Sequence, residues 1–312
     1  FKLMDLIAVL DDKKADTGTV YDSRGGRIQY YGRSVKDSNG KGYGKISLAR
    51  GFELSSNTIL VQSVYESYKN NPKQFVDRIN SYGLNKPLGL PIKGEGIPVI
   101  PQPGTNRWSG VALPWMAFGY GLSVTPLQTL TLYNAVANDG VMVKPIFVSE
   151  IKEWNKTIKK YNTEVINPKI CSQETLDKVQ AVLENVVKKG TGSKLYSKDF
   201  SMAGKTGTAQ VNYKDKSKLY YASSFVGYFP ADEPKYSCII VVHKPNVAAG
   251  YYGADVAGPV FKRIAQKIFT DSPSTNHVKN IDAKVVSQEK NYAEYYKKVE
   301  KESNVVPNVK GM

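Results

Sequence analysis

Three short groups of polar residues, far apart in the chain, carry side chains suited to acyl transfer. The segment 202–208 holds Lys205 beside two threonines, Ser55-Ser56-Asn57 offers hydroxyls and an amide, and the chain opens on Phe1-Lys2. A serine hydroxyl becomes an effective nucleophile only when a neighbouring base takes its proton. The two histidines, His243 and His277, have no second likely metal ligand near them in sequence, so we expect neither a Ser-His triad nor a metal site. A lysine of lowered pKa can take the place of the histidine base.

The Gly204-Lys205-Thr206 stretch has two competing interpretations, a phosphate-binding loop and a strand without chemistry. The phosphate loop requires a glycine where this chain has Asp199, whose negative charge is unsuited to a backbone phosphate cradle. Gly204 and Gly207 would weaken a plain strand unless something approaches its backbone closely. An extended peptide paired with an edge strand would account for them. We therefore expect a substrate-facing strand.

The catalytic interpretation gives each group a task. Lys2 has the spacing, one helical turn, to act as base for a serine at the helix start. Lys205 supplies a second positive charge that favours neutral Lys2. Ser55 relays a proton towards the leaving or attacking amine, and the Asn57 amide holds a substrate amide.

The segment 202–208 is suited to bind the anionic end of a substrate. The Thr206 and Thr208 hydroxyls, together with the Lys205 charge, can bind a terminal carboxylate. Gly207 lies between them on the same strand. The Thr208 backbone N–H can be one of two oxyanion donors, the other being the N–H of the nucleophilic serine.

Apolar spacing and capping signals predict the elements that position these groups. Helices are expected over 1–10, after Ser55-Ser56-Asn57, from Asn71-Pro72 to Gly83, from Thr125-Pro126 to about Asp139-Gly140, from Leu176 to Gly190, and after Pro259. Strands are expected at 141–148, around Lys205-Thr206-Gly207, at 221–229 and at 236–243, the last three in an antiparallel arrangement. Residues 11–45 and 84–106 are rich in Gly or Pro and predict turns and irregular segments, and 149–171 is a polar, lysine-rich stretch.

Composition limits the function classes. The formal charge of +15 comes from lysines scattered over the whole chain, without zinc spacing, a helix-turn-helix signal or a long basic run. We therefore expect no nucleic-acid partner but a solvated basic surface, with attraction to an anionic envelope as the softer alternative. Cys171 and Cys238 are too few for a disulfide scaffold, although a single bridge between them stays open. No apolar run is long enough to span a membrane.

In their order, the three groups resemble the Ser-x-x-Lys, Ser-Asp-Asn and Lys-Thr-Gly motifs of penicillin-binding proteins. Over residues 1 to about 270 the chain resembles the transpeptidase domain of a class B penicillin-binding protein. Residues 46–50 resemble the helix before the second motif, 119–128 a signature after the substrate cleft, and 203–210 the third motif. The ending 306–312 resembles the start of a truncated PASTA repeat, which points to the septal, cell-division type.

One departure from the family pattern affects the reaction directly. The nucleophilic serine of the first motif should stand two residues before Phe1, together with strands that precede it in the family. We expect the protein to continue upstream. The expected organisation is a transpeptidase domain over 1–270, incomplete at its N-terminus, a linker over 271–304, and the start of a PASTA-like repeat over 305–312.

The resemblance implies an α+β fold, in which a five-stranded antiparallel sheet is packed between helices beside a mostly helical subdomain. It implies a serine acyl-enzyme that crosslinks D-Ala-D-Ala stem peptides of peptidoglycan and is trapped by β-lactams, without a metal or organic cofactor. It also implies a bacterial protein on the extracytoplasmic face of the cytoplasmic membrane, held by an N-terminal anchor outside this chain. The implied partners are a septal glycan polymerase and division proteins.

Other functions share these motifs. A serine β-lactamase needs a deacylating group, and Glu95 lies in a suitable loop, although its surroundings lack the class A pattern. A D,D-carboxypeptidase would hydrolyse the acyl-enzyme instead of transferring it. A β-lactam sensor would acylate stably without crosslinking, and a scaffold would not react.

Overall fold

The structure is a computed structural model that describes residues 1–212, 215, 217–248 and 250–271. The chain divides into two compact units, Phe1–Gln266 and Lys267–Met312. The second unit is described only at 267–271, where the last helix ends. Apart from Asp271, the predicted linker and the predicted PASTA-like segment lie outside the described residues.

A mostly helical part of the first unit surrounds the N-terminal helix. Helix α1 (Lys2–Asp11) buries residues on all sides, as its continuous apolar sequence predicts. It packs against α3 (Asn57–Tyr68), α4 (Pro72–Ser81) and α7 (Gln173–Lys189). The other short helices here are α2 (Leu48–Glu53) and α5 (Ala112–Met116). The predicted turns of 11–45 contain β1 (Val20–Asp22) paired with β4 (Lys45–Ser47), the short helix η1 (Arg24–Gly26), and β2 (Arg27–Tyr30) paired with β3 (Arg33–Lys36).

The main sheet joins the three strands that the sequence predicts after residue 200. They are β9 (Ala203–Val211), β10 (Tyr220–Phe229) and β11 (Tyr236–His243), antiparallel in the order β11-β10-β9. The antiparallel arrangement is confirmed. In the described part of the chain the sheet has these three strands and not the five that the resemblance implied. One edge strand is therefore β9, which carries Lys205-Thr206-Gly207.

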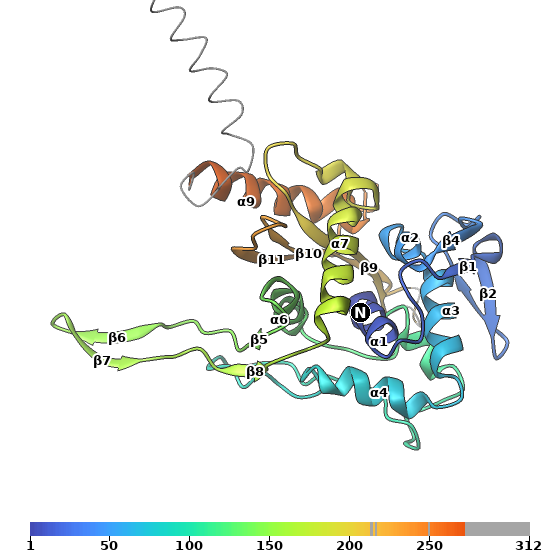
Figure 1. Cartoon of the computed structure of the whole chain (residues 1–312), viewed down its shortest axis with the longest axis horizontal. Helices are drawn as coiled ribbons and strands as arrows, with labels where there is room; N and C mark the ends of the chain where they lie inside the picture. The colour runs from blue at the N-terminus through green and yellow to red at the C-terminus, as the bar shows by residue number, and fades with distance from the viewer. Residues whose placement is uncertain (213–214, 216, 249, 272–312) are drawn as a thin grey trace, which may run out of the picture. The chain divides into compact units, whose positions relative to one another are not determined.

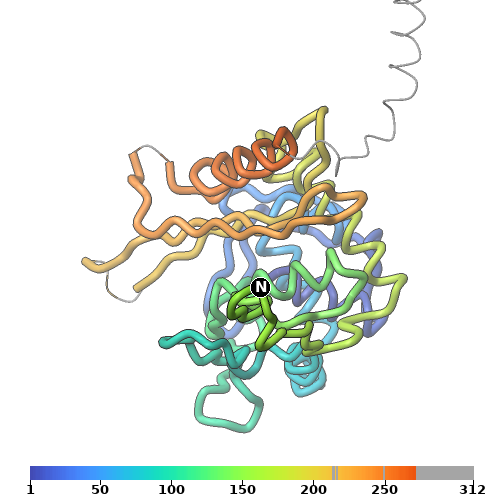
Figure 2. Tube along the Cα trace, turned by 90° about the vertical axis from the view of Figure 1, so that its left-hand side faces the viewer, coloured from blue at the N-terminus to red at the C-terminus, as the bar shows by residue number. Residues whose placement is uncertain are grey.

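Helices cover both faces of this sheet, so that its strands lie between two layers (Figures 1 and 2). Phe225 and Phe229 of β10 contact the Phe261 ring of α9 (Gly258–Asp271). Val226 and Tyr228, which point to the opposite face, join the main core with α7 and α6 (Pro126–Ala137). The predicted capping box is present in α6, where Thr125 and Gln128 cap each other's backbone.

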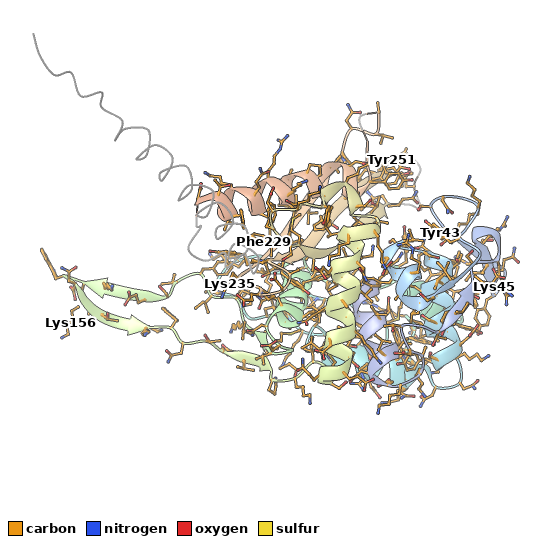
Figure 3. The ribbon with its side chains drawn as sticks, turned by 45° about the horizontal axis from the view of Figure 1, so that its top comes forward. Tyr43, Lys45, Lys156, Phe229, Lys235 and Tyr251 are labelled. Atoms are coloured by element: carbon orange, nitrogen blue, oxygen red, sulfur yellow. The ribbon has the colours of Figure 1, made fainter. Side chains whose placement is uncertain are left out.

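One element differs from the prediction for residues 141–171. The expected strand over 141–148 is only β5 (Met142–Val143), paired with β8 (Val165–Asn167). The polar stretch instead forms a hairpin of β6 (Glu150–Glu153) and β7 (Lys156–Lys160), exposed at every residue and projecting away from α6 and α7 (Figure 1). Lys156 lies on this hairpin, well away from Tyr43 and Tyr251 (Figure 3). Because neither strand of the hairpin buries a face, the sequence of the hairpin lacks the alternation of apolar and polar residues that identifies strands.

The cysteines and the longest apolar helices complete the description of the fold. Cys171 and Cys238 are both free thiols, so they do not form the bridge that the sequence left open. Within the described residues, no helix has the length and apolar character needed to cross a membrane.

Candidate active site

The amine of Lys2 lies among the polar groups of the second motif. Its Nζ donates to the Ser55 carbonyl oxygen at 2.6 Å, to Ser55 Oγ at 3.0 Å and to Asn57 Oδ1 at 2.7 Å. A lysine ammonium has three N–H donors, and these contacts use all of them. The structure therefore brings together three of the residues that the sequence analysis selected, from the start of α1 and the α2–α3 junction.

The backbone at this junction explains why Ser55 faces Lys2. Helix α2 ends at Glu53, and Ser55 adopts φ +57°, a left-handed conformation that is uncommon for a residue other than glycine. Ser56 follows as the N-cap of α3, with its side chain accepting from the Ile59 N–H. The sharp reversal between the two helices thus presents both the carbonyl and the hydroxyl of Ser55 to one amine.

A buried carboxylate, Asp37, fixes this reversal. Asp37 is 4% exposed and accepts from Ser56 Oγ at 3.0 Å, from the Thr58 N–H at 3.0 Å and from Thr58 Oγ1 at 2.8 Å. Sequence reasoning missed Asp37 because it lies in a Gly-, Ser- and Asp-rich segment far from the motif. Nothing in the sequence distinguishes it from the aspartates of ordinary turns.

Asn57 is held in one orientation by its neighbours. Its Nδ2 donates to the Lys36 carbonyl at 2.8 Å, which turns Oδ1 towards Lys2. The sequence analysis assigned this amide to a substrate. In the structure its oxygen positions the Lys2 amine, and one of its two N–H groups is already used.

The third motif presents a second buried amine. Lys205 is 4% exposed, and its Nζ donates to Thr206 Oγ1 at 3.2 Å and to the Thr206 carbonyl at 3.3 Å. The same nitrogen lies 5.7 Å from the centre of the Phe52 ring in α2, within range of a cation–π contact. The strand β9 therefore faces the helix that leads into Ser55. Within the described residues no hydrogen bond joins Lys205 or Thr208 to the Lys2 cluster.

The glycines of the third motif are explained by packing of the protein itself. A Cβ on Gly204 would meet the Val226 carbonyl and the Phe225 ring, and a Cβ on Gly207 would meet Ser224 Oγ. The sequence analysis attributed both glycines to a substrate close to the strand, and the close approach is instead that of β10. The Thr208 side chain is exposed, and its Oγ1 accepts from the Gly253 N–H at 3.0 Å, at the start of α8 (Gly253–Val256).

Burial changes the acid–base properties of both amines. Burial lowers the pKa of Lys2 to about 8, against the opposing influence of Asp37 and Asp5. Burial also lowers the pKa of Lys205, and the Lys2 charge lowers it further. The sequence analysis expected the Lys205 charge to favour neutral Lys2. Burial is the main cause of the lowered pKa of both amines, and each positive charge disfavours the other.

The alternative deacylating group, Glu95, has a structural task. Its carboxylate accepts from the backbone N–H groups of Leu88 and Leu90. These backbone hydrogen bonds, the one from Leu90 first, lower the pKa of Glu95, so the group stays ionised while it closes its own loop. In the part of the chain that the structure describes, no cluster of three His, Cys, Asp or Glu side chains could hold a metal ion.

Comparison with known proteins identifies this arrangement. The family model described as the penicillin binding protein transpeptidase domain matches residues 1–266. The chain therefore belongs to the penicillin-binding protein transpeptidase-domain family, and its relatives are of class B.

Three relatives show how similar the chain is to curated members of this family. Stage V sporulation protein D of Bacillus subtilis is 29% identical over 85% of this chain and 40% of that protein. PbpB of Mycolicibacterium smegmatis is 30% identical over 77% of this chain and 38% of that protein. The peptidoglycan D,D-transpeptidase FtsI of Escherichia coli K12 is 31% identical over 61% and 30%. The chain spans less than half the length of each of these relatives.

Solved structures agree with this assignment. Penicillin-binding protein 3 of Mycobacterium tuberculosis in its apo form superposes with a TM-score of 0.75 at 26% identity, covering 87% of this chain and 62% of that one. The same protein complexed with aztreonam gives a TM-score of 0.74 at 26% identity, covering 87% and 61%. The expected penicillin-binding protein fold is thereby confirmed.

Proposed function

We propose that the full-length protein is a bacterial peptidoglycan D,D-transpeptidase that crosslinks stem peptides through a serine acyl-enzyme. The observation that carries this proposal is the Lys2 amine, buried, of lowered pKa, and 3.0 Å from Ser55 Oγ. The names of the relatives, which include a peptidoglycan D,D-transpeptidase, support the same reaction. The proposed nucleophile is a serine two residues before Phe1, one helical turn from Lys2.

Acylation begins when neutral Lys2 takes the proton of this serine. The serine oxygen attacks the carbonyl carbon of the penultimate D-alanine, and the bond to the nitrogen of the terminal D-alanine breaks. That nitrogen must receive a proton to leave as an amine, and Ser55 can pass it on from Lys2 through the contact between them. When Lys2 is neutral, its lone pair can accept from the Ser55 hydroxyl across the same distance.

Deacylation reverses these proton movements. The amine of a second stem peptide attacks the ester carbonyl, gives its proton to the Ser55–Lys2 pair, and forms the crosslinking amide. The serine oxygen leaves and recovers a proton from Lys2. Asn57 keeps the Lys2 amine in place throughout, because its oxygen is aimed at Nζ by the Lys36 carbonyl.

The third motif supplies the substrate-binding edge. Strand β9 lies at the edge of the sheet and can pair with an extended stem peptide or with the bicyclic β-lactam that mimics its end. We assign the terminal carboxylate to Lys205, Thr206 and Thr208, with Gly207 between the two threonines on the same strand. The Thr208 N–H serves as an oxyanion donor, and losing such a donor typically costs about 10²–10³-fold in rate.

The cellular setting follows from this substrate. Peptidoglycan lies outside the cytoplasmic membrane, so we place the domain on the extracytoplasmic face, attached through an N-terminal anchor outside this chain. A septal glycan polymerase and division proteins are the proposed partners. The proposal requires no metal or organic cofactor.

Labelling with a fluorescent penicillin tests the proposal. The full-length protein should become covalently labelled, and labelling should disappear when alanine replaces the serine two residues before Phe1. Labelling that persists in this variant would overturn the nucleophile assignment.

Product analysis with a D-Ala-D-Ala donor and an added acceptor amine then separates the alternatives. Amide formation supports transpeptidation, and release of the hydrolysed donor alone indicates a carboxypeptidase. Rapid turnover of the penicillin indicates a β-lactamase. Stable labelling without any reaction of the donor indicates a sensor, and no labelling at all indicates a scaffold.

A further inference from the structure

A short segment after α7 connects the second and third motifs. On one side it is attached to α2, just before Ser55. The Thr191 N–H donates to the Glu53 carbonyl at 2.9 Å, and Arg50 Nη1 donates both to the Lys189 carbonyl at 2.9 Å and to Glu53 Oε2 at 2.8 Å. Glu53 is 3% exposed, so its hydrogen bond with the Thr191 N–H is shielded from water and competes little with solvent.

On its other side the same segment contacts the third motif. Thr191 Oγ1 lies 2.8 Å from Thr206 Oγ1, and Lys205 Nζ donates to that same Thr206 oxygen at 3.2 Å. The hydroxyl of Thr206 thus has two neighbours within the protein. Only one of them, Lys205, was selected by the sequence analysis.

The backbone around Thr191 has little freedom to move. A Cβ on Gly190 would meet the Glu53 carbonyl and the Val186 backbone, and a Cβ on Gly192 would lie 3.2 Å from the Val186 carbonyl. Both glycines are therefore packed tightly against α7 or α2. Between them, the Thr191 side chain is the group that reaches β9.

We propose that Thr191 is a positioning residue for the acylation reaction, and that its hydroxyl donates to Thr206 Oγ1. A hydroxyl oxygen accepts two hydrogen bonds and donates one. With Lys205 and Thr191 as its two donors, Thr206 keeps its own proton for a third partner, the carboxylate of the substrate. The hydrogen bond from the Thr191 backbone N–H to the Glu53 carbonyl holds this hydroxyl in place beside Thr206. This inference rests on the proposed function and adds a residue outside the three motifs.

The test compares Thr191→Val and Thr191→Ser in the full-length protein. Valine keeps the shape of threonine and removes the hydroxyl, whereas serine keeps the hydroxyl. The acylation rate is measured with a penicillin that carries its free carboxylate and with the methyl ester of the same penicillin. Ser193→Ala, which changes an exposed side chain in the same segment, is the matched control. Thermal unfolding shows whether each variant is folded.

Thr191→Val should slow acylation by the free penicillin about 3- to 10-fold, the effect of one hydrogen bond. Acylation by the methyl ester should change less than about twofold, because the contact that Thr206 makes to the carboxylate is absent from that reaction. Thr191→Ser and Ser193→Ala should resemble the unchanged protein with both compounds.

Three results would overturn the inference: an unchanged rate in Thr191→Val, equal slowing with both penicillins, or a Thr191→Ser variant as slow as Thr191→Val. Equal slowing would show that Thr191 only supports the fold. Failure of the proposed function is a different result, because the unchanged protein would then not be acylated by either compound.

Discussion

The pH dependence of acylation follows directly from the burial of Lys2. Only neutral Lys2 can take the proton of the serine, and its pKa is lowered to about 8. The neutral fraction is then about 9% at pH 7 and about 90% at pH 9, so the rate should rise about tenfold over this interval. An unperturbed lysine would be neutral on the order of 300-fold less often at pH 7. Burial of this one amine therefore accounts for a large part of the reactivity at neutral pH.

The assay measures the second-order rate constant for acylation by a labelled penicillin, at concentrations below saturation, between pH 6 and pH 9.5. Under these conditions the profile reports the pKa values of the free enzyme. Lys2→Ala should abolish nearly all labelling while the protein stays folded, and Lys41→Ala, an exposed lysine, should leave the profile unchanged. A flat profile between pH 7 and pH 9, or a rate that falls with pH, would refute Lys2 as the base.

Three further predictions concern the supports of the site and the projecting hairpin. Asp37→Asn should move the midpoint of the pH profile below 8, because Asp37 raises the pKa of Lys2. The same change should lower the free energy of unfolding by about 1–3 kcal/mol, because it weakens the hydrogen bonds to Ser56 and Thr58. An unmoved midpoint would contradict this prediction. Gly204→Ala should lower the free energy of unfolding, measured by heat or denaturant, by about 1–3 kcal/mol. Gly18→Ala should leave it unchanged, because Gly18 has open space around it. Equal effects of the two substitutions would contradict the packing argument. Trp154→Asn, at a hairpin position with φ +48° and 97% exposure, should change stability by less than about 0.5 kcal/mol and leave acylation unchanged.

Much of the fold could be predicted because its elements bury one face. The helices α1, α3, α4, α6, α7 and α9 and the strands β9, β10 and β11 each have apolar spacing or caps that identify them. The β6–β7 hairpin was missed because it buries nothing and has no such pattern. The short strand pairs of 11–45 were predicted only as extended pieces. The partners β1 and β4 lie far apart in sequence, and the adjacent strands β2 and β3 are only four residues long each.

The sequence identified the motif residues of the site but not the residues that hold them in position. Lys2, Ser55 and Asn57 were selected by residue type and order, and the structure places them in contact. Asp37 and Thr191 could not be found in this way, because each acts through a contact between segments far apart in the chain. The glycine argument failed for a related reason: the space that Gly204 leaves is taken by Val226 and Phe225 of β10, and the sequence predicts the neighbouring strand but not the register that brings these two residues there.

The left-handed conformation of Ser55 leads to a last prediction, which separates the effect of backbone strain on stability from the effect of the hydroxyl on reactivity. A non-glycine residue at φ +57° is strained by roughly 1 kcal/mol, and the contacts of the α2–α3 junction maintain this strain. Ser55→Gly removes the strain together with the hydroxyl, whereas Ser55→Ala removes the hydroxyl and keeps the strain. Both variants lose the Oγ contact to Lys2, so both should acylate slowly.

The difference in stability between the two variants measures the backbone strain at position 55. Chemical denaturation should show Ser55→Gly more stable than Ser55→Ala by a few tenths of a kcal/mol up to about 1 kcal/mol, because the greater freedom of glycine in the unfolded chain offsets part of the relief. Equal stability, or a more stable alanine variant, would mean that the junction imposes no strain on Ser55. In that case the hydrogen bonds of the junction, including those of Asp37, would hold the Ser55 hydroxyl beside Lys2 without backbone strain.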